Sequence, residues 1–219
     1  MGVLNSAALT ALNIDKDTLE PMGGEYIKDP TTGLLNGLIT ETAFALARAK
    51  ATKFPVSTAL TITRAASQMY IEKGVTTAQN GLTLKAHMSD LARSSRMGIS
   101  PLRIVAWPDE QYGHEIVDGT EVIAPYAHDK FILGAIKIVA DGSLQLYSGF
   151  LSQPYHTSPP GKKADDVGYP SIDAKTLTDT VIKFHKAGYQ MAIHGNGDAA
   201  IDNIINAIAA AQEVAYRED

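Results

Sequence analysis

In Tyr189-Gln-Met-Ala-Ile-His-Gly-Asn-Gly-Asp198 a short apolar run ends in a glycine-rich turn, and a helical pattern follows it. Isoleucines recur at positions 201, 204, 205 and 208, which is the spacing of one helix face. Side chains alternate along a strand, so His194 points to the opposite side from Ile193 and stands last in the strand. The segment is therefore predicted to be a strand with His194 at its carboxyl end, followed by a helix.

The same order of elements occurs upstream of this stretch. Strands are predicted at 75–79, 102–107 and 131–139, and helices at 57–73, 84–97 and 173–186. Alternating strands and helices indicate a parallel sheet covered by helices, and both a (βα)8 barrel and an open doubly wound sheet have this pattern. The predicted fold class is therefore α/β, with about four parallel strands.

Two segments depart from the alternation. Residues 1–54 contain turn sequences such as Pro21-Met-Gly-Gly24 and then a helix near 41–50, so we assign them to an N-terminal arm and residues 55–219 to a strand–helix domain. The second segment, 142–170, follows the carboxyl end of the strand at 131–139. A connection of this length at that end of a parallel sheet is typically a lid or binding loop.

Composition excludes several classes of function. Hydrophobic residues make up 45% and charged residues 20% of the chain, as in globular proteins that are not embedded in a membrane. The net charge of -5 is scattered, whereas nucleic-acid binding requires a basic patch, and no apolar run is long enough to span a bilayer. No signal peptide is visible, which favours a cytoplasmic protein. Because the chain has no cysteine, a metal would need histidine or oxygen ligands.

A lysine lies within the strand Phe131-Ile-Leu-Gly-Ala-Ile-Lys-Ile-Val139. Lys137 is expected to point into the middle of a parallel sheet, which is unfavourable for an ammonium group unless it is paired or neutralised. Desolvation lowers the pKa of a lysine, and the free amine can take up CO2 to form a carbamate, an anionic ligand for two metals. The alternative is an ion pair of Lys137 with Asp141 or a glutamate.

A lysine on one strand and a histidine on the next resembles the ligand order of the amidohydrolase superfamily. The chain resembles most closely amidohydrolase family 3, the group that includes N-substituted formamide deformylase-like proteins. The matching segments are Asn5-Ser-Ala-Ala-Leu9, Pro21-Met-Gly-Gly-Glu25, Gly33-Leu-Leu-Asn-Gly-Leu38, Gly74-Val-Thr-Thr77, Lys137-Ile-Val-Ala-Asp-Gly-Ser143 and His194-Gly-Asn-Gly-Asp-Ala-Ala-Ile-Asp202. They run from the first residues nearly to the last, so the resemblance covers essentially the whole chain.

The resemblance implies a (βα)8 barrel in which the predicted strands are strands two to five, that is, about half of a TIM-type barrel. It implies that Lys137 and His194 bind a divalent metal, most simply Zn2+, and that the parent enzyme hydrolyses an amide-like C–N bond with a metal-activated water. The family's His-x-His pair, its next ligand histidine and its catalytic aspartate have no counterpart here. We therefore expect an internal fragment without a complete catalytic set or its native N-terminus, with little or no activity alone.

Three further residues are candidates for the substrate side of the site. Asp141 follows the lysine strand, Trp107 ends its own strand on the side of the proposed site, and His156 lies in the long connection. For Trp107 the alternative is a core aromatic, and for His156 it is an ordinary surface residue.

Two other functions fit the sequence. The turn from His194 to Asp198 precedes a helix, so its N–H groups could hold an anion or a small molecule, although it lacks the Lys-Ser/Thr of a phosphate loop. The chain could also be an inert truncation product. Among partners we expect a small amide-like substrate and a second copy of the chain, because four strand–helix units cannot close an eight-stranded barrel.

Overall fold

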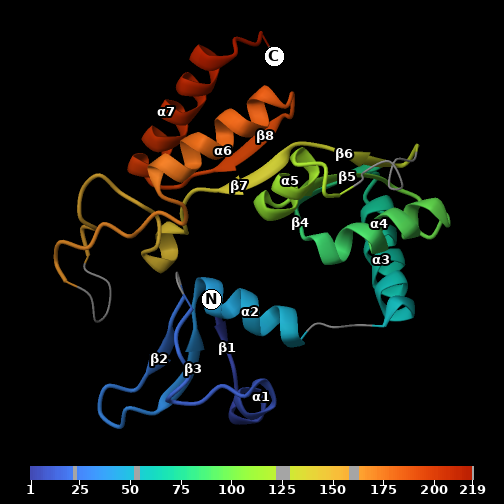
Figure 1. Ribbon diagram of the computed structural model, residues 1–219. Coiled ribbons are helices and arrows are strands. Elements are labelled where there is room, and N and C mark those ends of the chain that lie inside the picture. Colours follow the sequence, from blue (N-terminus) through green and yellow to red (C-terminus); the bar gives the residue numbers. More distant parts are fainter. Residues whose placement is uncertain (22–23, 52–54, 122–128, 158–162, 219) are drawn as a thin grey trace. The chain divides into compact units, whose positions relative to one another are not determined.

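The computed structural model describes residues 1–21, 24–51, 55–121, 129–157 and 163–218 (Figure 1). The chain forms two compact units, residues 1–54 and residues 55–219. Within the described ranges, no helix combines the length and the apolar composition needed to cross a bilayer.

The first unit is a small antiparallel sheet with two helices. Its elements are β1 (Gly2–Val3), α1 (Ser6–Leu12), β2 (Tyr26–Lys28), β3 (Leu35–Ile39) and α2 (Glu41–Ala51), and the strand order is β1-β3-β2. Ile39 and Ala43 are buried at its centre together with Tyr26. The sequence predicted a helix near 41–50 in this region but not the sheet, because strands of two to five residues show too little alternation to be recognised.

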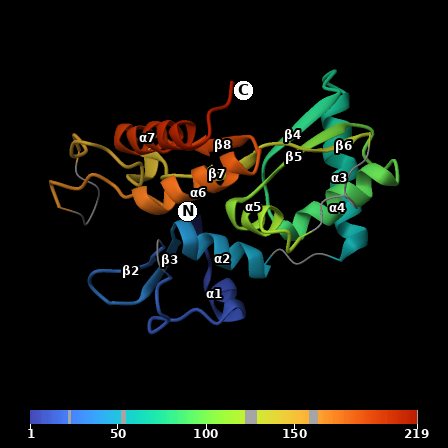
Figure 2. The ribbon, with the colours of Figure 1, turned by 45° about the horizontal axis from the view of Figure 1, so that its top comes forward.

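The second unit contains the alternating strands and helices. Its elements are α3 (Val56–Ile71), β4 (Thr77–Thr83), α4 (Lys85–Arg96), β5 (Arg103–Pro108), α5 (Glu110–Val117), β6 (Phe131–Leu133), β7 (Ile136–Val139), a 3-10 turn (Leu144–Leu146), α6 (Ala174–Lys186), β8 (Met191–His194) and α7 (Asp198–Val214). Figures 1 and 2 show α6 and α7 side by side next to β7 and β8. The short helix α5 was not predicted from the sequence.

The strands of this unit are parallel. β4 pairs with β5, β5 pairs with β6, and β7 pairs with β8. An isolated parallel bridge between Asp109 and Lys137 connects the end of β5 to β7. The predicted α/β class with parallel strands is therefore confirmed, whereas closure into half of a barrel stays a prediction.

The strand predicted at 131–139 is interrupted at Gly134 and Ala135, and the interruption changes which side chains face the helices. Continuous alternation over residues 131–139 would place Ile132 and Ile136 on one face, but Ile132 is 47% exposed and Ile136 is buried. Trp107 on the neighbouring strand β5 explains the break, because a Cβ at Gly134 would lie 2.6 Å from its indole ring. The strand therefore passes the ring with a glycine and resumes in the opposite phase.

Two apolar clusters join the helices to the sheet. One contains the buried side chains of β7, α6 and α7, namely Ile136, Ile138, Ala140, Leu177, Val181, Phe184, Ala200, Ala207 and Ala211. The other contains those of α4, β5, α5 and β6, including Met88, Ile104, Tyr112 and Phe131. Full burial of each large side chain contributes about 1.5–3 kcal/mol. Because Ile136 and Ile138 face the helices, Lys137 between them faces the other side of the sheet.

Candidate functional site

Lys137 and His194 lie on neighbouring parallel strands. In the pairing of β7 with β8, Lys137 is opposite Ala192 and Val139 is opposite His194. Paired residues point to the same side of a sheet, and residues two apart in one strand do so as well. Lys137 and His194 therefore share the face that points away from the α6–α7 cluster, with His194 nearer the carboxyl end.

Lys137 is half-buried on this face, and its burial lowers the pKa of its amine. Within the described part of the chain, no carboxylate lies within ion-pair distance of its Nζ atom. The alternative ion pair with Asp141 does not form, because the carboxylate of Asp141 is bound elsewhere. Lys137 is thus a partly desolvated amine at the strand face.

Asp141, a candidate for the substrate side of the site, binds backbone groups of two loops. Its side chain is fully buried, and its carboxylate accepts backbone N–H groups from Phe150, Asn196 and Gly197 at 2.8–2.9 Å. Hydrogen bonds to a charged acceptor contribute about 1.5–3 kcal/mol each. A buried carboxylate with three backbone donors organises the surrounding loops, while a contact of Asp141 with substrate stays a prediction.

The same contacts bear on the anion-binding alternative. Two N–H groups of the turn after β8, those of Asn196 and Gly197, already donate to the carboxylate of Asp141. The carboxylate of Asp141 is thus the anion that these two N–H groups bind in the structure. These two donors are therefore not available to a bound anion or phosphate.

His194 is half-buried at the end of β8 and contacts the side chain of Asn196. The Nδ2 atom of Asn196 lies 3.0 Å from the His194 Nε2 atom and donates to the carbonyl oxygen of Gly142 at 2.8 Å. Sequence reasoning missed Asn196, although its place between two glycines and two residues after His194 was visible. The turn after β8 and the start of the long connection therefore meet at this histidine.

The long connection packs against the beginning of α7. Asp198 stands in the first turn of α7, and its carboxylate accepts hydrogen bonds from the hydroxyl and the N–H of Ser152. These bonds lower the pKa of Asp198. Gly197 and not Asp198 occupies the capping position, so Asp198 joins the connection to the helix in addition to accepting the N–H of Ala199.

Trp107 and His156 occupy different environments. Trp107 is half-buried on β5, in the strand phase of Val105, and its ring covers Gly134. His156 is exposed in the long connection. Whether either side chain meets a substrate stays a prediction, while the contact of the ring with Gly134 gives Trp107 a packing function.

The donor set does not by itself fit a metal. No cluster of three or more histidine, aspartate or glutamate side chains that could hold a metal ion occurs in the described ranges. A catalytic zinc site has three protein ligands and a water molecule. Lys137 and His194 could supply two of the protein ligands, so the remainder would have to come from outside the described residues.

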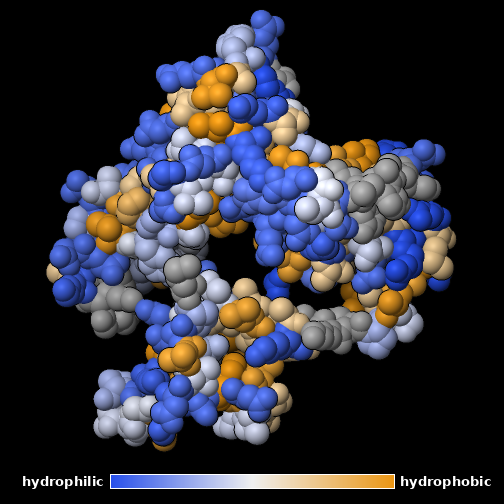
Figure 3. Space-filling model, viewed as in Figure 1, coloured by the Kyte–Doolittle hydropathy of each residue, from blue (hydrophilic) through white to orange (hydrophobic). Residues whose placement is uncertain are grey.

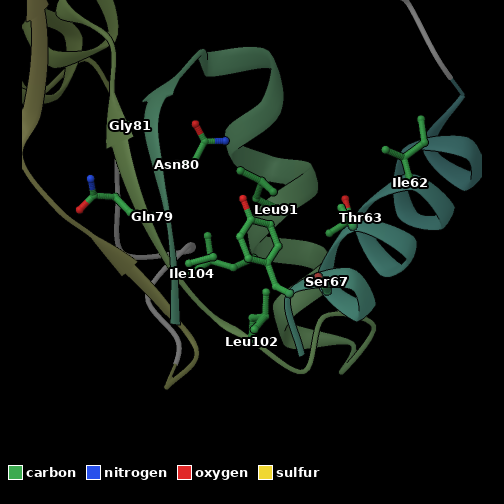
Figure 4. A pocket seen from close by; sticks show the side chains of 12 residues that line it. Ile62, Thr63, Ser67, Gln79, Asn80, Gly81, Leu91, Leu102 and Ile104 are labelled. Carbon is green, nitrogen blue, oxygen red and sulfur yellow. The ribbon is translucent and has the colours of Figure 1, made fainter. Parts of the chain in front are cut away.

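A cavity of about 410 Å³ lies between α3 and β4, on the other side of the sheet (Figure 4). Its lining is mainly apolar, with Ile62, Leu91, Leu102 and Ile104 among the side chains. The hydroxyl group of Ser67, which also lines the cavity, lies 2.9 Å from that of Ser100. Ile104 and Ala78 pack in the helix-side cluster, so the cavity is not part of the site around Lys137 and His194.

Sequence comparison gives a family and two curated relatives. Residues 2–219 match the amidohydrolase family. The putative amidohydrolase YtcJ of Bacillus subtilis (strain 168) is 29% identical over 222 residues, which cover 94% of this chain and 38% of YtcJ. The exoenzymes regulatory protein AepA of Pectobacterium carotovorum subsp. carotovorum is 24% identical over 97% of this chain and 46% of AepA. The chain spans less than half of the length of each relative.

Solved structures share the fold. An uncharacterized metal-dependent hydrolase from Pyrococcus furiosus matches with a TM-score of 0.69 and 19% identity, over 96% of this chain and 41% of that one. A second one, from Pyrococcus horikoshii OT3, matches with a TM-score of 0.67 and 20% identity, over 94% and 39% of the two chains. At this identity the likeness concerns the arrangement of strands and helices.

Proposed function

Because this chain belongs to the amidohydrolase family, we propose that it is part of a metal-dependent enzyme that hydrolyses an amide-like C–N bond in a small molecule. Strands β4 and β5, the interrupted strand formed by β6 and β7, and strand β8 would be strands two to five of a (βα)8 barrel. The observation that carries the proposal is the placement of Lys137 and His194 on one face of two neighbouring parallel strands, with His194 at the carboxyl end of its strand. Functional residues of parallel barrels lie at this end.

A divalent metal such as Zn2+ would polarise the substrate carbonyl and activate a water molecule. In this chain Lys137 and His194 are the residues proposed to contact it. Two protein ligands leave a weak site, so we expect the 219-residue chain to bind zinc weakly and to hydrolyse amides little or not at all. N-substituted formamides are the substrates that we propose to test first, because the sequence landmarks resemble that group.

The proposal is tested by zinc titration and by amide hydrolysis with the 219-residue chain. His194→Ala is expected to abolish the weak zinc binding, whereas the control His156→Ala changes an exposed histidine and should leave it intact. Zinc binding that is equal in His194→Ala and in the unmodified chain would remove His194 from the site. Hydrolysis of a formamide that is lost in His194→Ala would show that the chain holds a complete site.

We also propose that the isolated chain associates with itself. In the described residues no strand pairs with the outer edge of β4 or β8. Helix α7 carries the exposed side chains Ile201, Ile205 and Ile208 at one-turn spacing, and hydrophobic surface is visible over this helix in Figure 3. Open strand edges and apolar helix faces of this kind favour association. A dimer whose copies cover each other's inner sheet face is the simplest arrangement.

A further inference from the structure

The contact between Asn196 and His194 has a defined polarity. The amide nitrogen Nδ2 of Asn196 donates to the Gly142 carbonyl oxygen at 2.8 Å and lies 3.0 Å from the His194 Nε2 atom. The reverse orientation of the amide would place its oxygen against the Gly142 oxygen, two acceptors facing each other. An amide nitrogen only donates, so Nε2 of His194 must accept, and the proton of the neutral imidazole must be on Nδ1.

The position of Asn196 is itself fixed by the backbone. Its N–H donates to the buried carboxylate of Asp141 at 2.9 Å, and the N–H of Gly197 donates to the same group at 2.8 Å. A Cβ at Gly197 would lie 1.8 Å from the carbonyl oxygen of Phe150, so the turn passes this loop with no room for a side chain. The turn therefore has little freedom to move Asn196 away from the histidine.

We propose that Asn196 is a positioning residue that holds the His194 ring in place and selects its Nδ1–H tautomer. The hydrogen bond at one ring nitrogen decides which nitrogen carries the proton, and thereby which one can bind a cation. With Asn196 in place, the Nε2 lone pair is engaged and Nδ1 is protonated. A cation at His194 must therefore displace the amide or the Nδ1 proton. The importance of this selection rests on the proposed function, but the selection itself does not require a metal.

The tautomer is measured by nuclear magnetic resonance on the 15N-labelled, chelator-treated 219-residue chain at about pH 8, where imidazoles of ordinary pKa are neutral. Correlations from the ring carbon-bound protons to the two ring nitrogens distinguish the tautomers. The His194 signal among the six histidines is identified by its loss in His194→Gln. We expect a predominantly Nδ1–H ring in the unmodified chain and a shift to a mixed or Nε2–H ring in Asn196→Ala.

The matched control is Asn206→Ala, which removes an exposed asparagine from α7 and should leave the His194 tautomer unchanged. A predominantly Nε2–H ring in the unmodified chain would overturn the proposal, as would an unchanged tautomer in Asn196→Ala. The tautomer is measured on metal-free protein, so its outcome does not depend on zinc binding. Absence of zinc binding in the separate titration would therefore refute the proposed function alone. An unexpected tautomer together with His194-dependent zinc binding would refute the positioning role alone.

Discussion

Replacement of Asp141 by asparagine tests how strongly the buried carboxylate holds the site together. The N–H groups of Phe150 and Gly197 meet at one carboxylate oxygen, and the N–H of Asn196 meets the other. Asparagine has one acceptor oxygen and one donor group. It could keep the first two hydrogen bonds, but its NH2 group would then face the N–H of Asn196.

The expected cost follows from these contacts. A buried N–H without an acceptor costs about 1–3 kcal/mol, and the two remaining bonds lose the charge of their acceptor. Relief of the buried charge offsets part of this loss, so we expect Asp141→Asn to lower the free energy of unfolding by roughly 3 kcal/mol. For a chain of this size that corresponds to a fall in melting temperature of about 10 °C.

Thermal unfolding is followed by circular dichroism and by the fluorescence of the single tryptophan, Trp107, which lies in the same unit as Asp141. Asp179→Asn is the matched control, because Asp179 is exposed on α6 and its ion pair within the described residues is with exposed Lys175. The control is expected to melt with the unmodified chain, since surface pairs contribute little. Equal melting temperatures for Asp141→Asn and the unmodified chain would refute the structural role of the carboxylate.

Three other outcomes are expected. The hydrogen bonds from Ser152 lower the pKa of Asp198. The stabilisation that they give is therefore present above the unfolded-state pKa and is lost as the pH falls below about 4. The difference in melting temperature between the unmodified chain and Asp198→Asn should shrink below this pH. Lys137 should remain an unmodified lysine, and 13C-bicarbonate spectra should show no carbamate signal that Lys137→Ala removes. Light scattering should show an oligomer at micromolar concentration, and deletion of the residues before Thr40 should weaken it; a stable monomer would contradict this.

The sequence predicts the elements with strong periodicity. The strand that ends at His194 and the helix after it are confirmed, because Ile193 packs with the α6–α7 cluster and α7 begins at Asp198. The alternation pattern fails at Gly134, where the strand is interrupted. Which side chains face the helices after the interruption depends on the packing of the Trp107 ring from β5 against Gly134, which the local sequence does not show. The N-terminal sheet escapes prediction for a related reason, because its short strands gain their order from pairing and not from local pattern.

The site is predictable only in part, because its side chains act through backbone groups distant in sequence. Lys137 and His194 could be placed on one sheet face from alternation alone. The role of Asp141 could not, since its donors lie nine residues and more than fifty residues further along the chain. A carboxylate that binds backbone N–H groups leaves no complementary residue type to recognise in the sequence.

The carboxylate of Asp141 also couples the motions of two segments that are distant in sequence. The connection after β7 and the turn after β8 both donate to it, so neither can leave without depriving a buried charge of its donors. Hydrogen exchange at the amides of Phe150 and Gly197 should therefore occur through one shared opening event, with similar free energies. Local opening of the connection after β7 and loss of the geometry around His194 would then be a single transition. The imidazole would be ordered only while these hydrogen bonds to Asp141 are formed.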